Sequence, residues 1–268
     1  MNEAGSHPGS RPTVLVFAGA DPSGGAGIAA DILAIAAMGA HALPVITALT
    51  VQDNARVFEV MPVASDVVRR QALALIDTIA IHAVKIGIPG NRANAEAIAD
   101  LIGQLRRHRP DLPVVLDPVL ASGAGDFLTR ADALAPLLAL ATLTVPNLPE
   151  AQALGLEGGI GTGSGDVLVT GGHAEGAFVV NRWLSGIYER AWRWPRLPGQ
   201  FHGSGCTLAA AIAARLACGD GMERALGTAQ QYCHDALAGA FSIASGQRIP
   251  QRFIHPPCLT HIPGQETP

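Results

Sequence analysis

Short apolar segments alternate with amphipathic helical patterns along most of this sequence. Residues 14–18 (VLVFA) form a continuous apolar run, which is typical of a strand buried on both faces of a sheet. Within residues 25–38, the apolar positions from Ile28 to Met38 follow at spacings of four, three and three, which places them on one helical face. Strands that alternate with helices imply right-handed crossovers and a mostly parallel sheet. The sequence therefore predicts an α/β fold with helices on both faces of the sheet.

The same alternation continues toward the C-terminal end. We expect further strands at residues 43–49, 82–87, 113–117, 143–145 and 167–170. We expect further helices at residues 65–79, 95–107, 131–140, 207–217 and 222–244. Ser185 and Gly186 separate two strand-like segments and suit a hairpin turn, so antiparallel strands should finish one edge of the sheet.

Composition and charge narrow the class of protein. With 49% hydrophobic residues among 268, the chain can bury a large core, and no low-complexity linker divides it. We expect one domain over residues 13–258, with tails at 1–12 and 259–268. A net charge of −4 with scattered basic residues argues against nucleic acid or a membrane as a partner. The sequence lacks a membrane-length apolar run, a signal-peptide pattern and paired cysteines, so we expect a cytoplasmic protein with reduced thiols.

A cysteine follows a glycine-rich loop at the start of a predicted helix. In the segment FHGSGCT, Gly203, Ser204 and Gly205 lead directly to Cys206. The backbone N–H groups of such a loop converge on an anion, and the helix terminus adds about half a positive charge. Both effects should lower the pKa of the thiol toward neutrality. We therefore expect a phosphate-binding loop with a reactive cysteine.

Polar residues follow most of the predicted strands. In an open parallel sheet the ligand lies beyond the carboxyl ends of the strands, so these residues should meet around it. Asp117 and Glu150, together with Asn147, offer the oxygen ligands that Mg²⁺ prefers. The chain has neither a GxxxxGK[ST] nor a GxGxxG motif, so the phosphate site must be the late loop. This combination indicates phosphoryl transfer from a Mg²⁺-bound nucleotide.

Several ordered motifs resemble those of the hydroxymethylpyrimidine/phosphomethylpyrimidine kinases of thiamine biosynthesis. They are AGADPSGGAG (18–27) with Asp31, VITAL (45–49) with Gln52, KIG (85–87), LDPV (116–119), PNLPEA (146–151), GGH (171–173) and HGSGCT (202–207). Several motifs in the same order are far more specific than any one of them. The resemblance implies a ribokinase-like fold, which is a three-layer sandwich, and ATP-dependent phosphorylation of 4-amino-5-hydroxymethyl-2-methylpyrimidine and its monophosphate. It also implies a homodimer.

The resemblance further implies roles for individual residues. Cys206 would activate the substrate hydroxyl, while Gly203, Ser204 and Gly205 would stabilise the transferring phosphoryl group. The implied substrate-binding residues are Gly19, Asp21, Ala26, Gly27, Gln52, Ile88 and Val119. The implied nucleotide-binding residues are Asn147, Thr170, Gly172 and His173, with Asp117 and Glu150 as metal ligands.

Some positions depart from the family pattern. Thr170 stands where the family usually has a lysine, which removes a cation near the nucleotide phosphates. The segment between Ala151 and Val167 is shorter and richer in glycine than usual. Ile88 replaces a methionine, and a Gly-Ile-Gly-Pro sequence near the C-terminal end is absent. The first two differences bear on the nucleotide side of the site.

Purely structural roles compete with these functional ones. For Lys85, a charge within an apolar strand, we favour a structural ion pair over catalysis. The other candidates also have structural alternatives. Cys206 could be a small buried side chain, and Gly24, Gly25 and Gly27 could permit close packing. Gln52 could occupy a turn, Asp117 could end a strand, and Asn147 and Glu150 could cap a helix.

Two other functions stay open at this point. The first is a pyridoxal kinase, since some ribokinase-like pyridoxal kinases share the GSGC-type loop. The second is a pyrimidine-binding protein with weak catalysis, which Thr170 and the shortened segment after Ala151 favour. Turnover of both alcohols, and binding of ATP, would separate the three hypotheses.

Overall fold

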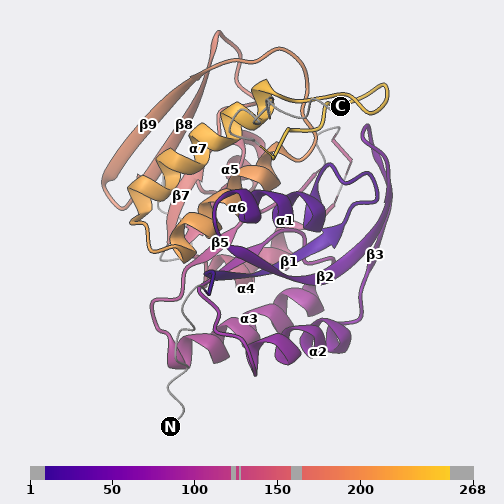
Figure 1. Ribbon diagram of the computed structural model, residues 1–268, viewed down its shortest axis with the longest axis vertical. Coiled ribbons are helices and arrows are strands. Elements are labelled where there is room, and N and C mark those ends of the chain that lie inside the picture. Colours follow the sequence, from indigo (N-terminus) through magenta and orange to yellow (C-terminus); the bar gives the residue numbers. More distant parts are fainter. Residues whose placement is uncertain (1–9, 122–124, 127, 158–164, 254–268) are drawn as a thin grey trace, which may run out of the picture.

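The strands of this protein form one mixed sheet. The computed structural model describes residues 10–121, 125–126, 128–157 and 165–253, and there the sheet has nine strands in the order β3-β2-β1-β4-β5-β6-β7-β8-β9 (Figure 1). Their bounds are β1 (Thr13–Ala20), β2 (His41–Gln52), β3 (Val57–Pro62), β4 (Ala83–Ile86), β5 (Val114–Leu116), β6 (Leu143–Thr144), β7 (Asp166–Val169), β8 (Phe178–Ser185) and β9 (Tyr188–Pro195). Strands β2, β1, β4, β5, β6 and β7 run parallel, whereas β3, β8 and β9 each run antiparallel to the preceding strand.

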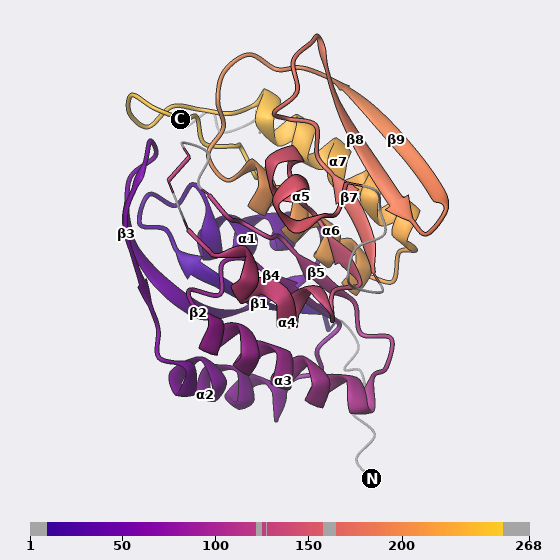
Figure 2. The ribbon, with the colours of Figure 1, turned by 180° about the vertical axis from the view of Figure 1, so that it is seen from behind.

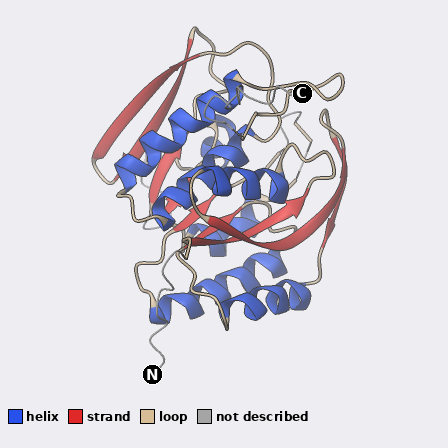
Figure 3. Ribbon diagram, in the orientation of Figure 1, coloured by secondary structure: helices blue, strands red, loops and turns tan. Residues whose placement is uncertain are grey.

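Helices cover both faces of the sheet (Figures 2 and 3). One layer contains α1 (Gly27–Ala37), α6 (Ser204–Ala217) and α7 (Met222–Ala238), in which α6 packs against both α1 and α7. The other layer contains α2 (Ser65–Ile76), α3 (Arg92–His108), the 3-10 turn η1 (Ala131–Leu134) with α4 (Ala135–Leu138), and α5 (Leu148–Leu154). The predicted three-layer α/β architecture is therefore confirmed.

The strand β1 shows why this sequence forms a two-sided sheet. Val14, Val16 and Ala18 join the core beneath α1 and α6, whereas Leu15 and Phe17 join the core beneath α2 and α3. All five side chains are buried, because successive side chains of a strand point to opposite faces. A continuous apolar run is therefore what this central position requires.

Several elements differ from the sequence prediction. The edge strand β3 is not predicted, because its side chains are half-exposed or exposed and lack the apolar run of a buried strand. Helix α6 begins at Ser204 rather than at residue 207, which places Cys206 inside its first turn. Helix α7 ends at Ala238 rather than at residue 244, because the chain turns at Gly239 and brings Phe241 back to pair with Ile249.

The predicted antiparallel hairpin is confirmed as β8 and β9 at one edge of the sheet. The predicted helix at residues 131–140 is shorter and consists of η1 followed by α4. Within the described ranges, every helix is too short or too polar to cross a membrane.

Candidate active site

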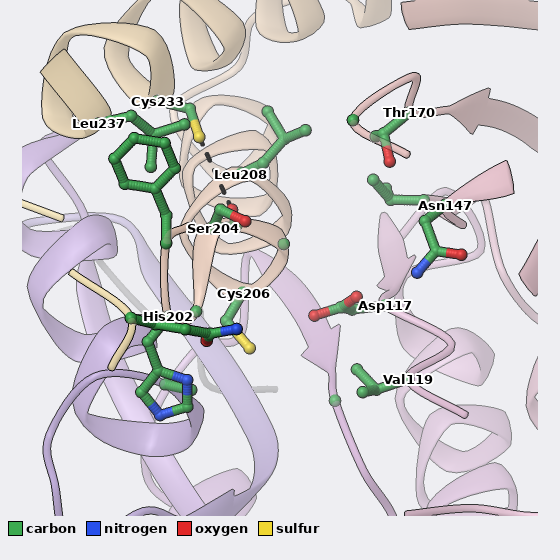
Figure 4. A pocket seen from close by; sticks show the side chains of 18 of the residues that line it. Asp117, Val119, Asn147, Thr170, His202, Ser204, Cys206, Leu208, Cys233 and Leu237 are labelled. Atoms are coloured by element: carbon green, nitrogen blue, oxygen red, sulfur yellow. Dashed lines mark hydrogen bonds between the residues drawn. The ribbon is translucent and has the colours of Figure 1, made fainter. Parts of the chain in front are cut away.

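The carboxyl ends of the parallel strands border a cavity of about 560 Å³. Figure 4 shows His202, Ser204 and Cys206 on one side of it, with Asp117, Val119, Asn147 and Thr170 on the other. The residues predicted for the site all line this cavity: Gly19, Asp21, Ala26, Gly27, Gln52, Ile88, Asp117, Val119, Asn147, Glu150, Thr170, Gly172, His173, Gly203, Ser204, Gly205 and Cys206. The fold therefore brings together positions that lie up to 187 residues apart in sequence (206 − 19).

The first glycine loop, residues 21–27, is held by the carboxylate of Asp21. This carboxylate accepts hydrogen bonds from the N–H groups of Ser23 (2.8 Å) and Ala26 (2.7 Å), and His202 Nε2 lies 2.8 Å from it. Burial alone would raise the pKa of Asp21, but hydrogen bonds from His202, Ser23, Gln52 and Ala26 hold it well below its usual range. Gln52 is the last residue of β2, so a turn position for it is wrong.

The two glycine loops pack directly against each other. Gly203 has a left-handed backbone (φ +76°), and a Cβ on it would lie 2.1 Å from the carbonyl oxygen of Gly25. A Cβ on Gly25 would lie 2.1 Å from the ring of His202, and one on Gly27 would lie 2.2 Å from the carbonyl oxygen of Gly19. Close packing therefore accounts for Gly25 and Gly27, as the structural explanation predicted. Gly27 also lines the cavity.

Cys206 is half-buried at the third position of α6. Loss of water around the thiol raises the pKa of Cys206 to about 12; Lys85 opposes this shift, whereas Asp117 and Asp31 add to it. The predicted lowering of this pKa is therefore wrong. The sequence shows that Cys206 lies at a helix start, which lowers a thiol pKa. It does not show that Asp31 and Asp117, which belong to other parts of the chain, lie near the thiol and raise its pKa.

Lys85 lies in β4 beneath Cys206 and forms a buried ion pair, as predicted. Its Nζ is 3.0 Å from both carboxylate oxygens of Asp31 in α1 and 3.7 Å from Asp117 Oδ2. Burial raises the pKa of Asp31 to about 6, which leaves this carboxyl ionised at neutral pH. Burial alone would lower the pKa of Lys85, but Asp31, Cys206 and Asp117 raise it, so the ammonium stays charged.

Asn147 and Glu150 cap helix α5 and line the cavity at the same time. The Asn147 side chain accepts from the N–H of Glu150 (2.9 Å), and the Glu150 carboxylate accepts from the N–H of Asn147 (2.9 Å). The helix-capping role considered for these residues is therefore confirmed, and the arrangement is a capping box. Burial, together with Asp117, raises the pKa of Glu150 to about 7.

The carboxylates of Asp117 and Glu150 fit a magnesium ion. Asp117 Oδ2 is buried without a hydrogen-bond partner, and burial raises the pKa of this group. A cation between two such carboxylates would relieve their repulsion, and Mg²⁺ usually takes one or two carboxylates together with waters and phosphate oxygens. Among the described residues, no group of three or more His, Cys, Asp and Glu side chains is placed to enclose a metal.

Thr170 and the turn after it form the opposite wall. The Thr170 hydroxyl donates to the carbonyl of Pro146 (3.3 Å), while the N–H of Gly171 donates to Asn181 Oδ1 (3.0 Å). Asn181 in turn donates to Gln230 Oε1 (2.9 Å). This buried network fixes the backbone of the turn from behind.

The part of the wall that comes from β8, β9, the residue after β9 and α7 was not predicted from the sequence. The lining residues concerned include Val179, Asn181, Trp194, Arg196, Gln230 and His234. The sequence feature that could have indicated this wall is the presence of two polar residues, Asn181 and Gln230, on otherwise apolar faces. Their role cannot be predicted locally, because it depends on the hydrogen bond between them, which joins distant parts of the chain.

The sequence matches the family model described as Phosphomethylpyrimidine kinase over residues 21–251. This chain belongs to the phosphomethylpyrimidine kinase family. It is 36% identical over 266 residues to the hydroxymethylpyrimidine/phosphomethylpyrimidine kinase of Rhizobium meliloti, a match that covers 90% of this chain and 96% of the relative. The family that the ordered motifs indicated is confirmed.

Two solved structures share the fold. A phosphomethylpyrimidine kinase from Clostridium difficile superimposes with a TM-score of 0.68 at 28% identity, and covers 84% of this chain and 99% of that chain. An ADP complex of Bacillus subtilis pyridoxal kinase superimposes with a TM-score of 0.78 at 25% identity, and covers 91% of this chain and 98% of that chain. The ribokinase-like fold expected for a member of the phosphomethylpyrimidine kinase family is therefore confirmed.

Proposed function

We propose that this protein transfers the γ-phosphoryl group of ATP to the hydroxymethyl group of 4-amino-5-hydroxymethyl-2-methylpyrimidine, and then phosphorylates the monophosphate. The observation that carries the proposal is the position of Cys206, which faces Asp117 across one cavity at the N-terminus of α6 (Figure 4). Family membership and the R. meliloti relative support the substrate class, and the ADP complex of the pyridoxal kinase supports the nucleotide.

The N-terminus of α6 is suited to the transferring phosphoryl group. The first backbone N–H groups of a helix have no intrahelical partner, so those of Ser204, Gly205 and Cys206 are available to an anion. A phosphoryl transition state is loose, and stabilisation of its equatorial oxygens supplies much of the catalysis. The loop would therefore act as the anion site for the γ-phosphoryl group.

Cys206 would hold the substrate hydroxyl for attack. The new bond joins the hydroxymethyl oxygen to the γ-phosphorus, and the bond from that phosphorus to the bridging oxygen of ADP breaks. At neutral pH the thiol is protonated, because its pKa is raised to about 12. Cys206 would therefore take up the hydroxyl proton late in the transfer while it releases its own proton to the carboxylate of Asp117, whose pKa is raised by burial, so no preformed thiolate is needed.

Asp117 and Glu150 are the residues that would hold Mg²⁺, with Asn147 beside them. The ion would neutralise charge on the nucleotide phosphates. Asn147, Thr170, Gly172 and His173 are the proposed nucleotide contacts.

Gln52 and the first glycine loop form the proposed pyrimidine side. Gly19, Asp21, Ala26, Gly27, Ile88 and Val119 line this part of the cavity with it. The three free thiols at Cys206, Cys218 and Cys233 support the reducing cytoplasm as the place of action, whereas Cys258 lies outside the described residues. A homodimer stays a prediction from the family resemblance.

The proposal is tested by ATP-dependent turnover on three alcohols. We expect phosphorylation of the pyrimidine and of its monophosphate, with a lower kcat/KM for pyridoxal. A higher kcat/KM for pyridoxal would show that pyridoxal, rather than the pyrimidine, is the preferred substrate. Tight pyrimidine binding without ATP binding or turnover would make the protein a binding protein instead.

A further inference from the structure

Arg252 is buried between the two glycine loops. Its side chain is 2% exposed, which is unusual for an arginine, and it enters from the C-terminal segment after α7. Its Nε donates to Thr207 Oγ1 (2.9 Å), and one terminal nitrogen lies 2.5 Å from the carbonyl oxygen of Gly25 and 3.5 Å from that of Gly203. The guanidinium therefore contacts both loops and α6. The family match ends at residue 251, one residue earlier.

The two carbonyl groups determine where the neighbouring N–H groups point. In a trans peptide the C=O of one residue and the N–H of the next point in opposite directions. The carbonyl of Gly203 also accepts the N–H of Thr207 (2.9 Å), so the N–H of Ser204 points out of the helix end. By fixing the carbonyl of Gly203, the guanidinium of Arg252 therefore also fixes the direction of the Ser204 N–H, which we assign to the phosphoryl group.

On the other loop, the carbonyl of Gly25 is followed by the N–H of Ala26, which donates to Asp21 Oδ2 (2.7 Å). The same oxygen lies 2.8 Å from His202 Nε2, and His202 precedes Gly203 in the chain. The hydrogen bonds thus form a closed ring from Arg252 through both loops and back. A disturbance at Arg252 would reach both sides of the cavity.

The charge of Arg252 has no counter-ion at close range. Among the described residues, no carboxylate lies within 4.0 Å of its guanidinium nitrogens, and its hydrogen-bond acceptors are the neutral oxygens of Gly25, Gly203 and Thr207. A buried charge is costly unless it is paired. The carboxylate of Asp31 attracts this charge from beyond 4.0 Å, and an anion at the N-terminus of α6 would add a further negative charge, since Arg252 lies behind that terminus.

We propose that Arg252 is a positioning residue for phosphoryl transfer, which locks the loop of Gly203 to Cys206 in its anion-binding conformation and adds buried positive charge behind it. The inference rests on the proposed kinase function for its kinetic consequence. Its effect on anion binding can be measured without the pyrimidine.

The test compares Arg252→Met and Arg252→Lys with Tyr232→Phe. Tyr232 donates to the backbone carbonyl of Arg252 (2.9 Å), so its variant loosens the same segment and leaves the guanidinium in place. We expect Arg252→Met to lower kcat about 100-fold while KM for the pyrimidine changes less than about threefold. Arg252→Lys should recover part of kcat, and Tyr232→Phe should retain kcat despite a lower melting temperature.

A second measurement uses inorganic phosphate as the probe. Phosphate should raise the melting temperature of the wild type, and this increase should be lost in Arg252→Met and retained in Tyr232→Phe. If the wild type phosphorylates no alcohol, the proposed function fails, but loss of phosphate protection in Arg252→Met still supports the inference. Should Arg252→Met not fold, Arg252→Lys carries both measurements. Unchanged kcat and unchanged phosphate protection in the folded Arg252 variants would overturn it.

Discussion

His202 Nε2 lies 2.8 Å from Asp21 Oδ2 and joins the two glycine loops across 181 residues of sequence. Both side chains are largely buried, with 12% and 2% of their surface exposed. Asp21 also accepts hydrogen bonds from N–H groups of its own loop, residues 21–27. Through His202, this ordered loop therefore helps to position the second loop, residues 203–206. Loop geometry at the phosphate site therefore depends on a carboxylate that lies on the substrate side.

Asp21→Asn should reduce stability at neutral pH and less so in acid. We expect the free energy of unfolding to fall by about 1–3 kcal/mol at about pH 7. Because folding depresses the pKa of Asp21, its stabilisation is fully present above the pKa of an unfolded aspartate, about 3.9, begins to decline below that value, and is lost as the pH falls through the lower pKa of the folded state.

Urea unfolding of wild type and Asp21→Asn at about pH 7 and about pH 3 measures this difference. The exposed Asp77 provides a control, since Asp77→Asn should change stability little at either pH. A gap between wild type and Asp21→Asn that stays constant across this range would contradict the role given to the carboxylate.

Lys85→Met should destabilise the protein strongly, because it leaves the carboxylates of Asp31 and Asp117 buried without their cation. Loss of one partner of a buried ion pair typically costs about 3–5 kcal/mol. The double variant Asp31→Asn with Lys85→Met should be more stable than the single variant. Arg70→Met, which removes an exposed pair with Asp66, should change stability little in the same denaturation experiment.

Gly205→Ala should fold normally and lose activity. A Cβ at residue 205 would make only an ordinary contact of 3.7 Å with Asp117 Oδ1, so the structure accepts it, but it would occupy the lining of the phosphate site. We expect a melting temperature near that of the wild type and a kcat lowered about tenfold or more. Gly103→Ala, which meets nothing within 4 Å in α3, is the control and should keep full kcat.

The comparison with Gly203→Ala sharpens this prediction. Gly203 has φ +76°, and its Cβ would meet the Gly25 carbonyl at 2.1 Å, so this variant should lose stability as well as activity. Equal losses of stability in the two variants would argue that Gly205 has a packing role only.

Thr170→Lys should restore a cation on the nucleotide side. Thr170 lines the cavity, and the new ammonium could pair with nucleotide phosphates in largely aqueous surroundings. We expect KM for ATP to fall about two- to fivefold while KM for the pyrimidine stays constant, as measured by initial rates at varied ATP. Thr170→Met tests whether side-chain length alone has this effect; an equal change in KM for both variants would exclude a role of the charge.

Local sequence patterns predict the fold of this chain well, because strands such as β1 must be apolar on both faces. Strand ends also locate the candidate residues, since the carboxyl ends of parallel strands meet at one edge. The elevated pKa of Cys206 was not predictable, because it depends first on burial of the thiol in the fold and then on Asp31 and Asp117, which lie 175 and 89 residues away (206 − 31 and 206 − 117). The role of Arg252 was not predictable either, because it depends on hydrogen bonds to the carbonyl groups of Gly25 and Gly203 in two distant loops.

The most direct test follows the γ-phosphoryl group of ATP onto hydroxymethylpyrimidine in a single turnover with wild type, Cys206→Ala and Cys218→Ala. We predict rapid transfer by the wild type and by Cys218→Ala, and a rate lowered about 100-fold or more in Cys206→Ala. Transfer by Cys206→Ala within about twofold of the wild-type rate would contradict the placement of phosphoryl transfer at Cys206.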